Sequence, residues 1–190
     1  MVSNNSEAFP TAFKFLIAGG FGVGKTTFVR SVSEIEPLTT EETLTIASVG
    51  TDDLAGVGDK TTTTVAMDFG RITFNPQNLV LFLFGTPGQE RFWFMWDDLV
   101  RGALGAIVLA DTRRLEDCFA AVEFFERRGI DFLVAVNEFD GGFRYQPEEV
   151  REALDIKRHV PIMMCDARDK RSAASMLIHL TEHVLATRPA

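Results

Sequence analysis

A glycine-rich loop directly after an apolar run is the feature that most constrains how this chain can fold. The loop reads Gly19-x-x-x-x-Gly24-Lys25-Thr26 and follows the run 13–18, whose apolar residues alternate as in a strand. The residues after it, 26–35, can open a helix. Glycines let backbone N–H groups turn toward a phosphate, and the helix adds its positive N-terminal end. This context predicts a phosphate-binding loop rather than a plain glycine turn.

Residue types within the loop predict individual roles. The Lys25 ammonium would reach the β- and γ-phosphates of a nucleotide, and the Thr26 hydroxyl would hold Mg²⁺. The predicted nucleotide-binding positions of the loop are Phe21, Gly22, Val23, Gly24, Lys25, Thr26 and Thr27.

Composition limits the classes of partner. The chain has 190 residues, 46% hydrophobic and 24% charged, which suits one globular domain with a sizeable core. Its net charge of −8 argues against a nucleic-acid partner and against a simple electrostatic membrane anchor. The first residues lack the features of a signal peptide, and the longest apolar runs are too short to cross a bilayer. Two cysteines give no disulfide framework, so we expect a cytoplasmic protein.

The order of elements predicts the fold class. Strand-like runs at 13–18, 65–74, 79–85, 102–110, 131–137 and 161–165 are interleaved with helical patterns at 25–34, 113–129, 146–156 and 169–187. Residues 75–78 read as a hairpin turn between two of the strands. The pattern predicts an α/β P-loop fold: a mostly parallel central sheet with one antiparallel strand and helices on both faces.

Two segments that follow late strands predict recognition of a guanine base. Asp140, in Asn137-Glu138-Phe139-Asp140, can accept from both N1–H and the exocyclic amine of guanine, whereas adenine offers no such pair. Asn137 can tie this segment to the phosphate loop. The N–H of Ala167 could donate to the guanine carbonyl while the stem of Arg168 packs on the ring. The alternative for residues 165–169 is a polar turn that caps the last helix.

A second phosphate-sensing segment follows the strand at 79–85. In Gly85-Thr86-Pro87-Gly88-Gln89, the N–H of Gly88 can bind a γ-phosphate, and Gln89 can orient an attacking water. Gln89 is therefore the predicted catalytic residue.

These motifs and their order resemble the Ras-like small GTPases over about residues 13–185. More narrowly, residues 60–70, 83–96 and 101–114 resemble the conservon-type small GTPases of actinobacteria, with the MglA-type bacterial GTPases as more distant relatives. The resemblance implies the small G-protein fold and bound GTP or GDP with Mg²⁺. It also implies signalling with a roadblock-type protein and a histidine-kinase-like sensor, and a partner could recruit the protein to a membrane.

Three departures from that family pattern matter. Gly85 stands where D-x-x-G has its Asp, which helps to hold Mg²⁺; Asp68 could replace it or could be a solvent-facing strand residue. Glu138 replaces the lysine of N-K-x-D, which removes packing over the base and the phosphate loop. Phe21 is bulky where Ras itself has a small residue, so it could obstruct an arginine supplied by an activating protein, or simply pack on a neighbouring loop.

The threonine-rich stretch indicates the first switch. The resemblance makes Thr64, four residues before Asp68, the threonine that would hold Mg²⁺, and Thr61, Thr62 and Thr63 stay open as alternatives. We expect a flexible segment at 1–11 and one GTPase domain at 12–190. Within that domain we expect an extended switch I loop at about 36–64, although a disordered insertion that switches nothing is the alternative.

A run of bulky residues, 92–96, follows Gln89 at the second switch. Five consecutive positions cannot all face one core, so we expect Trp93 or Trp96 to contribute to a nucleotide-dependent partner surface. Local core packing is the alternative.

The sequence as a whole predicts a GTP-binding signalling switch with slow hydrolysis. A nucleotide-holding scaffold without turnover is the rival. A P-loop kinase is disfavoured because no lid or phosphoacceptor site is apparent.

Overall fold

A computed structural model describes residues 9–45, 62–75 and 78–187, and within these the side chains of residues 39–45, 62–66, 90 and 91 are not described. The strands are β1 (Thr11–Ala18), β2 (Leu38–Thr45), β3 (Thr62–Phe74), β4 (Leu79–Gly85), β5 (Ala103–Ala110), β6 (Phe132–Asn137) and β7 (Ile162–Cys165). The α-helices are α1 (Lys25–Val32), α2 (Trp96–Leu99), α3 (Phe119–Arg128), α4 (Pro147–Leu154) and α5 (Lys170–Thr187). Two 3₁₀ segments, η2 (Glu90–Met95) and η3 (Leu115–Cys118), precede α2 and α3.

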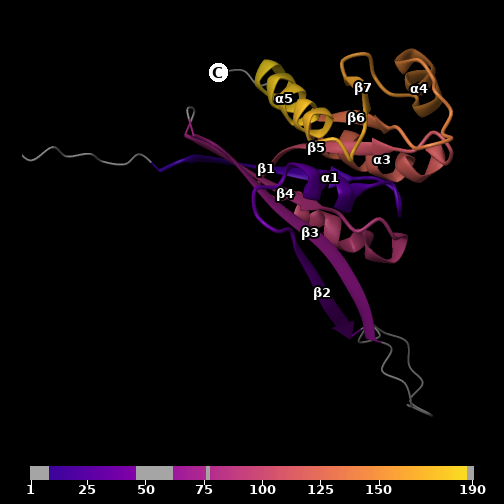
Figure 1. The fold of residues 1–190 in the computed structure, drawn as a ribbon. Helices are drawn as coiled ribbons and strands as arrows, with labels where there is room; N and C mark the ends of the chain where they lie inside the picture. Colours follow the sequence, from indigo (N-terminus) through magenta and orange to yellow (C-terminus); the bar gives the residue numbers. More distant parts are fainter. Residues whose placement is uncertain (1–8, 46–61, 76–77, 188–190) are drawn as a thin grey trace, which may run out of the picture.

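The strands form one seven-stranded sheet in the order β2-β3-β4-β1-β5-β6-β7 (Figure 1). β1 pairs in parallel with β4 and β5, and β6 continues in parallel to β7. β3 is antiparallel to both of its neighbours, so it is the one strand of the sheet that runs against the rest. The predicted fold class is confirmed. β3 and β4 pair as far as Phe74 and Leu79, and Asn78 donates its N–H to the carbonyl of Asn75 at 3.2 Å, as the predicted hairpin requires; residues 76 and 77 lie outside the described part.

Alternating side chains of the central strands build a core on each face of the sheet. On one face, Phe15 and Ile17 of β1 pack with apolar residues of α1 and α5. On the other face, Leu16 and Ala18 pack with residues of α2, α3 and α4. This alternation is the period-two pattern of the β1 sequence, and it explains why both faces of the sheet carry helices (Figure 1).

The predicted switch I loop at 36–64 is wrong in its boundaries. Leu38–Thr45 forms strand β2, which pairs along its whole length with Thr62–Phe69 of β3. The sequence Leu-Thr-Thr-Glu-Glu-Thr-Leu-Thr lacks the apolar alternation that predicts a half-buried strand, and β2 is instead held at the sheet edge by its ladder with β3. Residues 46–61, Thr61 among them, lie outside the described part of the chain.

The N-terminal boundary also moves. β1 begins at Thr11, which pairs with Leu79 and donates its N–H to the carbonyl of Asn78 at 2.8 Å, so the last residue of the expected flexible segment 1–11 belongs to the sheet. Residues 1–8 lie outside the described part. Among the described helices, none is long and apolar enough to span a membrane.

Candidate functional site

The motif-bearing loops meet at one edge of the sheet. β1, β4, β5, β6 and β7 are parallel, so the segments that follow them leave from the same side. Ligands of open α/β sheets bind at this carboxyl edge. Here it carries a cavity of about 290 Å³ lined by Phe21, Gly22, Gly24, Lys25, Thr26, Thr27, Asp68 and Gly88.

The phosphate loop needs glycine at its two ends. Gly19 has φ +131°, and a Cβ there would lie 2.4 Å from the carbonyl oxygen of Leu109. Gly24, the N-cap residue of α1, has φ +105°, and a Cβ there would lie 2.7 Å from Nδ2 of Asn137. The glycine-rich loop therefore leads directly into α1, as the sequence predicted. Val23 is a core residue, 3% exposed, so of its groups only the backbone can face a phosphate.

Lys25 is held inside this loop. Its ammonium donates to the carbonyls of Gly19 at 2.8 Å and Gly20 at 2.6 Å. Burial lowers the pKa of Lys25 to about 8, partly opposed by the charge of Asp68. Gly88 closes the same space, because a Cβ there would lie 2.6 Å from Lys25 Nζ. A buried ammonium among carbonyls is well placed to exchange those partners for phosphate oxygens.

Thr26 and Asp68 supply the oxygen ligands that Mg²⁺ prefers. The Thr26 hydroxyl donates to Asp68 Oδ2 at 2.6 Å, and Asp68 is 8% exposed. Because the hydroxyl proton is engaged by the carboxylate, the Thr26 oxygen keeps its lone pairs for a cation. Hard oxygen donors beside a phosphate loop fit Mg²⁺. The side chain of Thr64 lies outside the described part; its backbone pairs with Thr43 within the β2–β3 ladder.

Asp68 fills the space that an aspartate at position 85 would need. A Cβ on Gly85 would lie 3.1 Å from the Asp68 Cβ and 3.2 Å from its Oδ2. The β3–β4 register explains this closeness. Phe69 pairs with Phe84, and in an antiparallel ladder Asp68 and Gly85 are the next two opposed positions. Asp68 is thus no solvent-facing strand residue; a carboxylate lies beside Thr26, on β3 rather than β4.

Asn137 links the phosphate loop to the segment that follows β7. Its Nδ2 donates to the carbonyl of Val23 at 2.9 Å, and its Oδ1 accepts from the N–H of Ala167 at 2.9 Å. The predicted tie between Asn137 and the phosphate loop is therefore present. The bond from Ala167 to a base carbonyl stays a prediction, and it would compete with the bond to Asn137.

Asp140 and Arg168, the other predicted base-contacting residues, lie beside each other. Arg168 Nη1 donates to Asp140 Oδ2 at 3.1 Å, and the Asp140 side chain is 92% exposed. Arg168 is also bound by Asp166, with Nε to Oδ1 at 2.9 Å. A base that bonds Asp140 would replace the Arg168 guanidinium at that carboxylate.

Gln89 is the N-cap residue of η2 and follows Gly88 directly. The bulky side chains of the run 92–96 do not all face the core, as expected for five consecutive positions. Phe92 and Trp96 are buried, Trp93 and Met95 are half-buried, and Phe94 is exposed. Trp96 donates its indole N–H to Pro87 at 3.1 Å and packs against Phe124 and Phe125, so it is a core residue.

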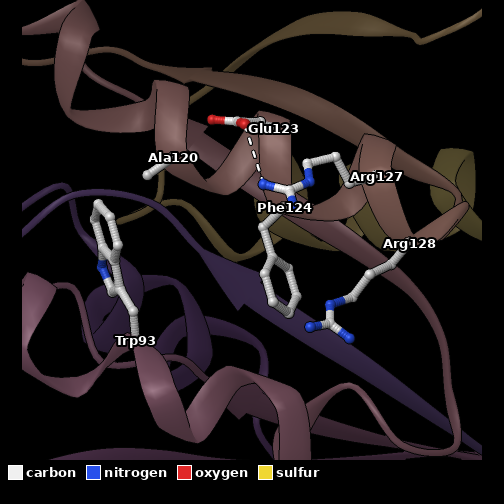
Figure 2. Close-up of a pocket in the computed structure, with 6 residues that line it drawn as sticks. All are labelled: Trp93, Ala120, Glu123, Phe124, Arg127 and Arg128. Atoms are coloured by element: carbon white, nitrogen blue, oxygen red, sulfur yellow. Dashed lines mark hydrogen bonds and ion pairs between the residues drawn. The ribbon is translucent and has the colours of Figure 1, made fainter.

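Trp93 instead lines a groove of about 470 Å³ between η2 and α3 (Figure 2). Phe124 faces it from α3, and Arg127 and Arg128 lie at the end of that helix, where Arg127 pairs with Glu123. The Arg128 guanidinium stacks on the Phe124 ring at 4.5 Å.

Phe21, Arg113 and Arg114 also lie at the carboxyl edge of the sheet. Phe21 is 65% exposed, which opposes the alternative that it packs on a neighbouring loop. Arg113 and Arg114, directly after β5, contact Phe139 and the carbonyl of Phe21 respectively. Sequence reasoning assigned these arginines no role, because their contacts depend on how separate loops meet in space.

Solved structures with a similar fold are G-domains. The cytosolic domain of the Thermotoga maritima iron transporter FeoB, in a GDP form, matches with a TM-score of 0.66 and 15% identity over 95% of this chain and 66% of that one. The FeoB G-domain of Methanococcus jannaschii matches with a TM-score of 0.61 and 14% identity over 92% of this chain and 99% of that one. The expected small G-protein fold is confirmed.

Two relatives by sequence match smaller parts of the chain. An uncharacterized protein of Methanocaldococcus jannaschii is 26% identical over 68% of this chain and 71% of its own length. The Ras-related protein RABC2a of Arabidopsis thaliana is 29% identical over 60% of this chain and 45% of its own length, so the chain spans less than half of that protein. Residues 17–187 match a family profile described as "Conserved hypothetical ATP binding protein", and the chain belongs to that family.

Proposed function

We propose that the chain binds a guanine nucleotide with Mg²⁺, hydrolyses GTP slowly to GDP and phosphate, and works as a signalling switch. The observation that carries the proposal is the bond from Asn137 to Val23, which ties residues 137–140, the proposed base-reading segment, to the phosphate loop. It supports the proposal because Asp140 follows β6 three residues after Asn137, while Lys25 and Thr26 follow β1 at the same edge of the sheet.

The choice of guanine rests on Asp140. The description of the family names ATP, and a phosphate loop by itself serves either nucleotide. A carboxylate pairs with the N1–H and amine of guanine, and against adenine it would face an acceptor and lose those bonds. The names of FeoB in its GDP form and of RABC2a, a Ras-related protein, agree with guanine.

The cation would be held by Thr26, with Asp68 behind it and Thr64 from the first switch. Bound Mg²⁺ would neutralise charge on the phosphates. Asp68 accepts a hydrogen bond from the Thr26 hydroxyl and so orients it. Gln89, next to Gly88, would orient the attacking water, and Gly88 itself lies against Lys25.

The rival proposal is a nucleotide-holding scaffold without turnover. Gly85 and Glu138 favour it, because each departs from a motif of active GTPases. The position of Asp68 beside Gly85 weakens the first of these arguments, since a carboxylate is still present there.

Partners would act at the second switch. We place a roadblock-type partner on the groove lined by Trp93 and Phe124, because η2 directly follows Gln89 and would move with the γ-phosphate (Figure 2). A histidine-kinase-like sensor, a cytoplasmic location and recruitment to a membrane by a partner follow from the family resemblance.

The test consists of two measurements on one protein preparation. The purified protein is denatured and the released nucleotide is identified by chromatography; phosphate release from added GTP is then followed on fresh protein with Mg²⁺. Guanine nucleotide with slow phosphate release supports the switch, guanine nucleotide without release supports the scaffold, and adenine nucleotide overturns both.

A further inference from the structure

We propose that Arg113 and Arg114, anchored on Asp111, clamp the base-reading segment and the phosphate loop together and slow nucleotide release. They would take over the task of the lysine that Glu138 replaces. The inference rests on the proposed nucleotide binding, and it adds two positioning residues to it.

Arg114 reaches the phosphate loop from the segment after β5. Its Nη2 donates to the carbonyl oxygen of Phe21 at 3.1 Å. The same Nη2 is the atom nearest to a Cβ built on Gly22, at 3.7 Å. The guanidinium therefore lies against the two loop residues that precede Val23, and it fixes the direction of a peptide group inside the phosphate-binding turn.

Asp117 of η3 is packed against that loop and pairs with Arg114. A Cβ on Gly20 would lie 2.5 Å from the Asp117 Cβ, so Asp117 occupies the space that glycine leaves. Arg114 Nη1 pairs with Asp117 Oδ2 at 3.6 Å. Arg114 thus bridges a carboxylate and a loop carbonyl on neighbouring segments.

Arg113 makes the matching contact on the base side. Its guanidinium carbon lies 4.0 Å from the ring centroid of Phe139, between Glu138 and Asp140 in the base-reading segment. Stacking of a guanidinium on an aromatic ring holds the ring without a covalent or hydrogen-bonded tether. The two neighbouring arginines therefore contact the two loops that the absent lysine would have bridged.

Asp111 is the common anchor. It is 3% exposed; Oδ1 accepts from the Arg113 backbone N–H and Nε, both at 2.9 Å, and Oδ2 accepts from Nη2 at 2.7 Å. Arg114 Nη2 lies 4.0 Å from the same Oδ2. The bonds from Arg113 hold the pKa of Asp111 below its ordinary value, so the anchor stays charged at neutral pH.

Glu138 itself is engaged elsewhere. Its carboxylate pairs with Arg144 at 3.4 Å, in the loop before α4. A lysine at 138 would restore the family's own bridge, which makes Glu138→Lys a second route to the same function and hence a means of testing the clamp.

The experiment follows release of a fluorescent GDP from the full chain with Mg²⁺ after a chase of unlabelled GDP. Arg114→Ala should release GDP about tenfold faster, the loss expected for one charge-assisted hydrogen bond. Arg113→Ala should also speed release. Arg101→Ala is the matched control, because Arg101 forms an exposed pair with Asp98 away from these loops, and it should release GDP at the parent rate.

Rescue separates clamping from general stability. Glu138→Lys added to Arg114→Ala should bring release back toward the parent rate, while Arg114→Ala alone should melt, free of nucleotide, near the parent temperature. Arg114→Gln provides a second variant should the alanine protein misfold. The clamp is overturned if Arg114→Ala and Arg114→Gln both release GDP within twofold of the parent rate. It is also overturned if release is faster but Glu138→Lys does not rescue it.

The outcome also distinguishes this inference from the proposed function. A parent protein that retains neither labelled GDP nor labelled ADP defeats both. A parent that retains nucleotide while Arg114→Ala leaves its release unchanged defeats the clamp alone.

Discussion

Replacing Asp68 with Asn should raise the Mg²⁺ concentration that the protein needs to retain GDP. The change keeps the shape of the side chain and removes its charge. The Thr26 hydroxyl then loses a charged acceptor 2.6 Å away, and the cation loses a carboxylate behind its ligand. Asp68 is 8% exposed, so water cannot readily replace the carboxylate.

The magnitude follows from the charge of the acceptor. A hydrogen bond to a charged group contributes about 1.5–3 kcal/mol, which corresponds to a shift of roughly ten- to a hundredfold in an equilibrium constant. We therefore expect the Mg²⁺ midpoint for GDP retention to rise by about that factor. The pKa of Lys25 should also fall below about 8, since the charge of Asp68 is what raises it.

A transplant makes the prediction sharper. Gly85→Asp in an Asp68→Ala background puts a carboxylate back into the same space, because the two Cβ positions are 3.1 Å apart. In this double variant, the Mg²⁺ midpoint for GDP retention should return most of the way to that of the parent. Gly85→Asp alone should bind Mg²⁺ poorly and fold less stably, since two carboxylates would crowd one buried position.

Release of fluorescent GDP at a series of buffered Mg²⁺ concentrations measures all four proteins. Asp98→Asn, which removes an exposed carboxylate, is the control and should match the parent. Superimposable Mg²⁺ curves for the parent and Asp68→Asn would refute the role given to Asp68.

Three further predictions concern single side chains. Lys25→Ala should weaken GDP binding by at least tenfold in a titration, because the phosphates lose their buried point charge. In the parent, the affinity for GDP should be constant below about pH 8 and should fall above it, because Lys25 of the nucleotide-free protein then loses the proton that binding must restore. Gln89→Leu should slow single-turnover phosphate release from GTP with little change in GTP affinity, and equal rates would remove Gln89 from catalysis. Trp96→Ala should cost about 3–5 kcal/mol of unfolding free energy in urea because the ring is buried, whereas the half-buried Trp93→Ala should cost clearly less and weaken a roadblock-type partner instead; equal losses of stability would contradict this division.

Much of the fold could be predicted because its central strands carry strong local signals. β5 and β6 are short apolar runs bounded by polar loops, and β1 alternates ahead of a phosphate-loop motif. The edge strand β2 was not predictable in this way, since its Thr- and Glu-rich sequence is ordered by a ladder with β3 that no local pattern reveals.

The site divides along the same line. The positions of Lys25, Thr26 and Asn137 around one loop could be predicted because each belongs to a motif with a defined spacing. The position of Asp68 against Gly85 depends on the β3–β4 register, and the contacts of Arg113 and Arg114 depend on which loops meet at the sheet edge. Both are tertiary facts that the residues alone leave open.

The central claim is that Asp140 selects guanine, and displacement of labelled GDP by unlabelled nucleotides tests it most directly. In the parent, GTP and GDP should displace the label at concentrations at least a hundredfold below those of ATP and ADP, since the mismatched base would lose two bonds to a carboxylate. Asp140→Ala should abolish that preference while the phosphate contacts remain. Displacement by ATP as effective as displacement by GTP in the parent protein would contradict the account.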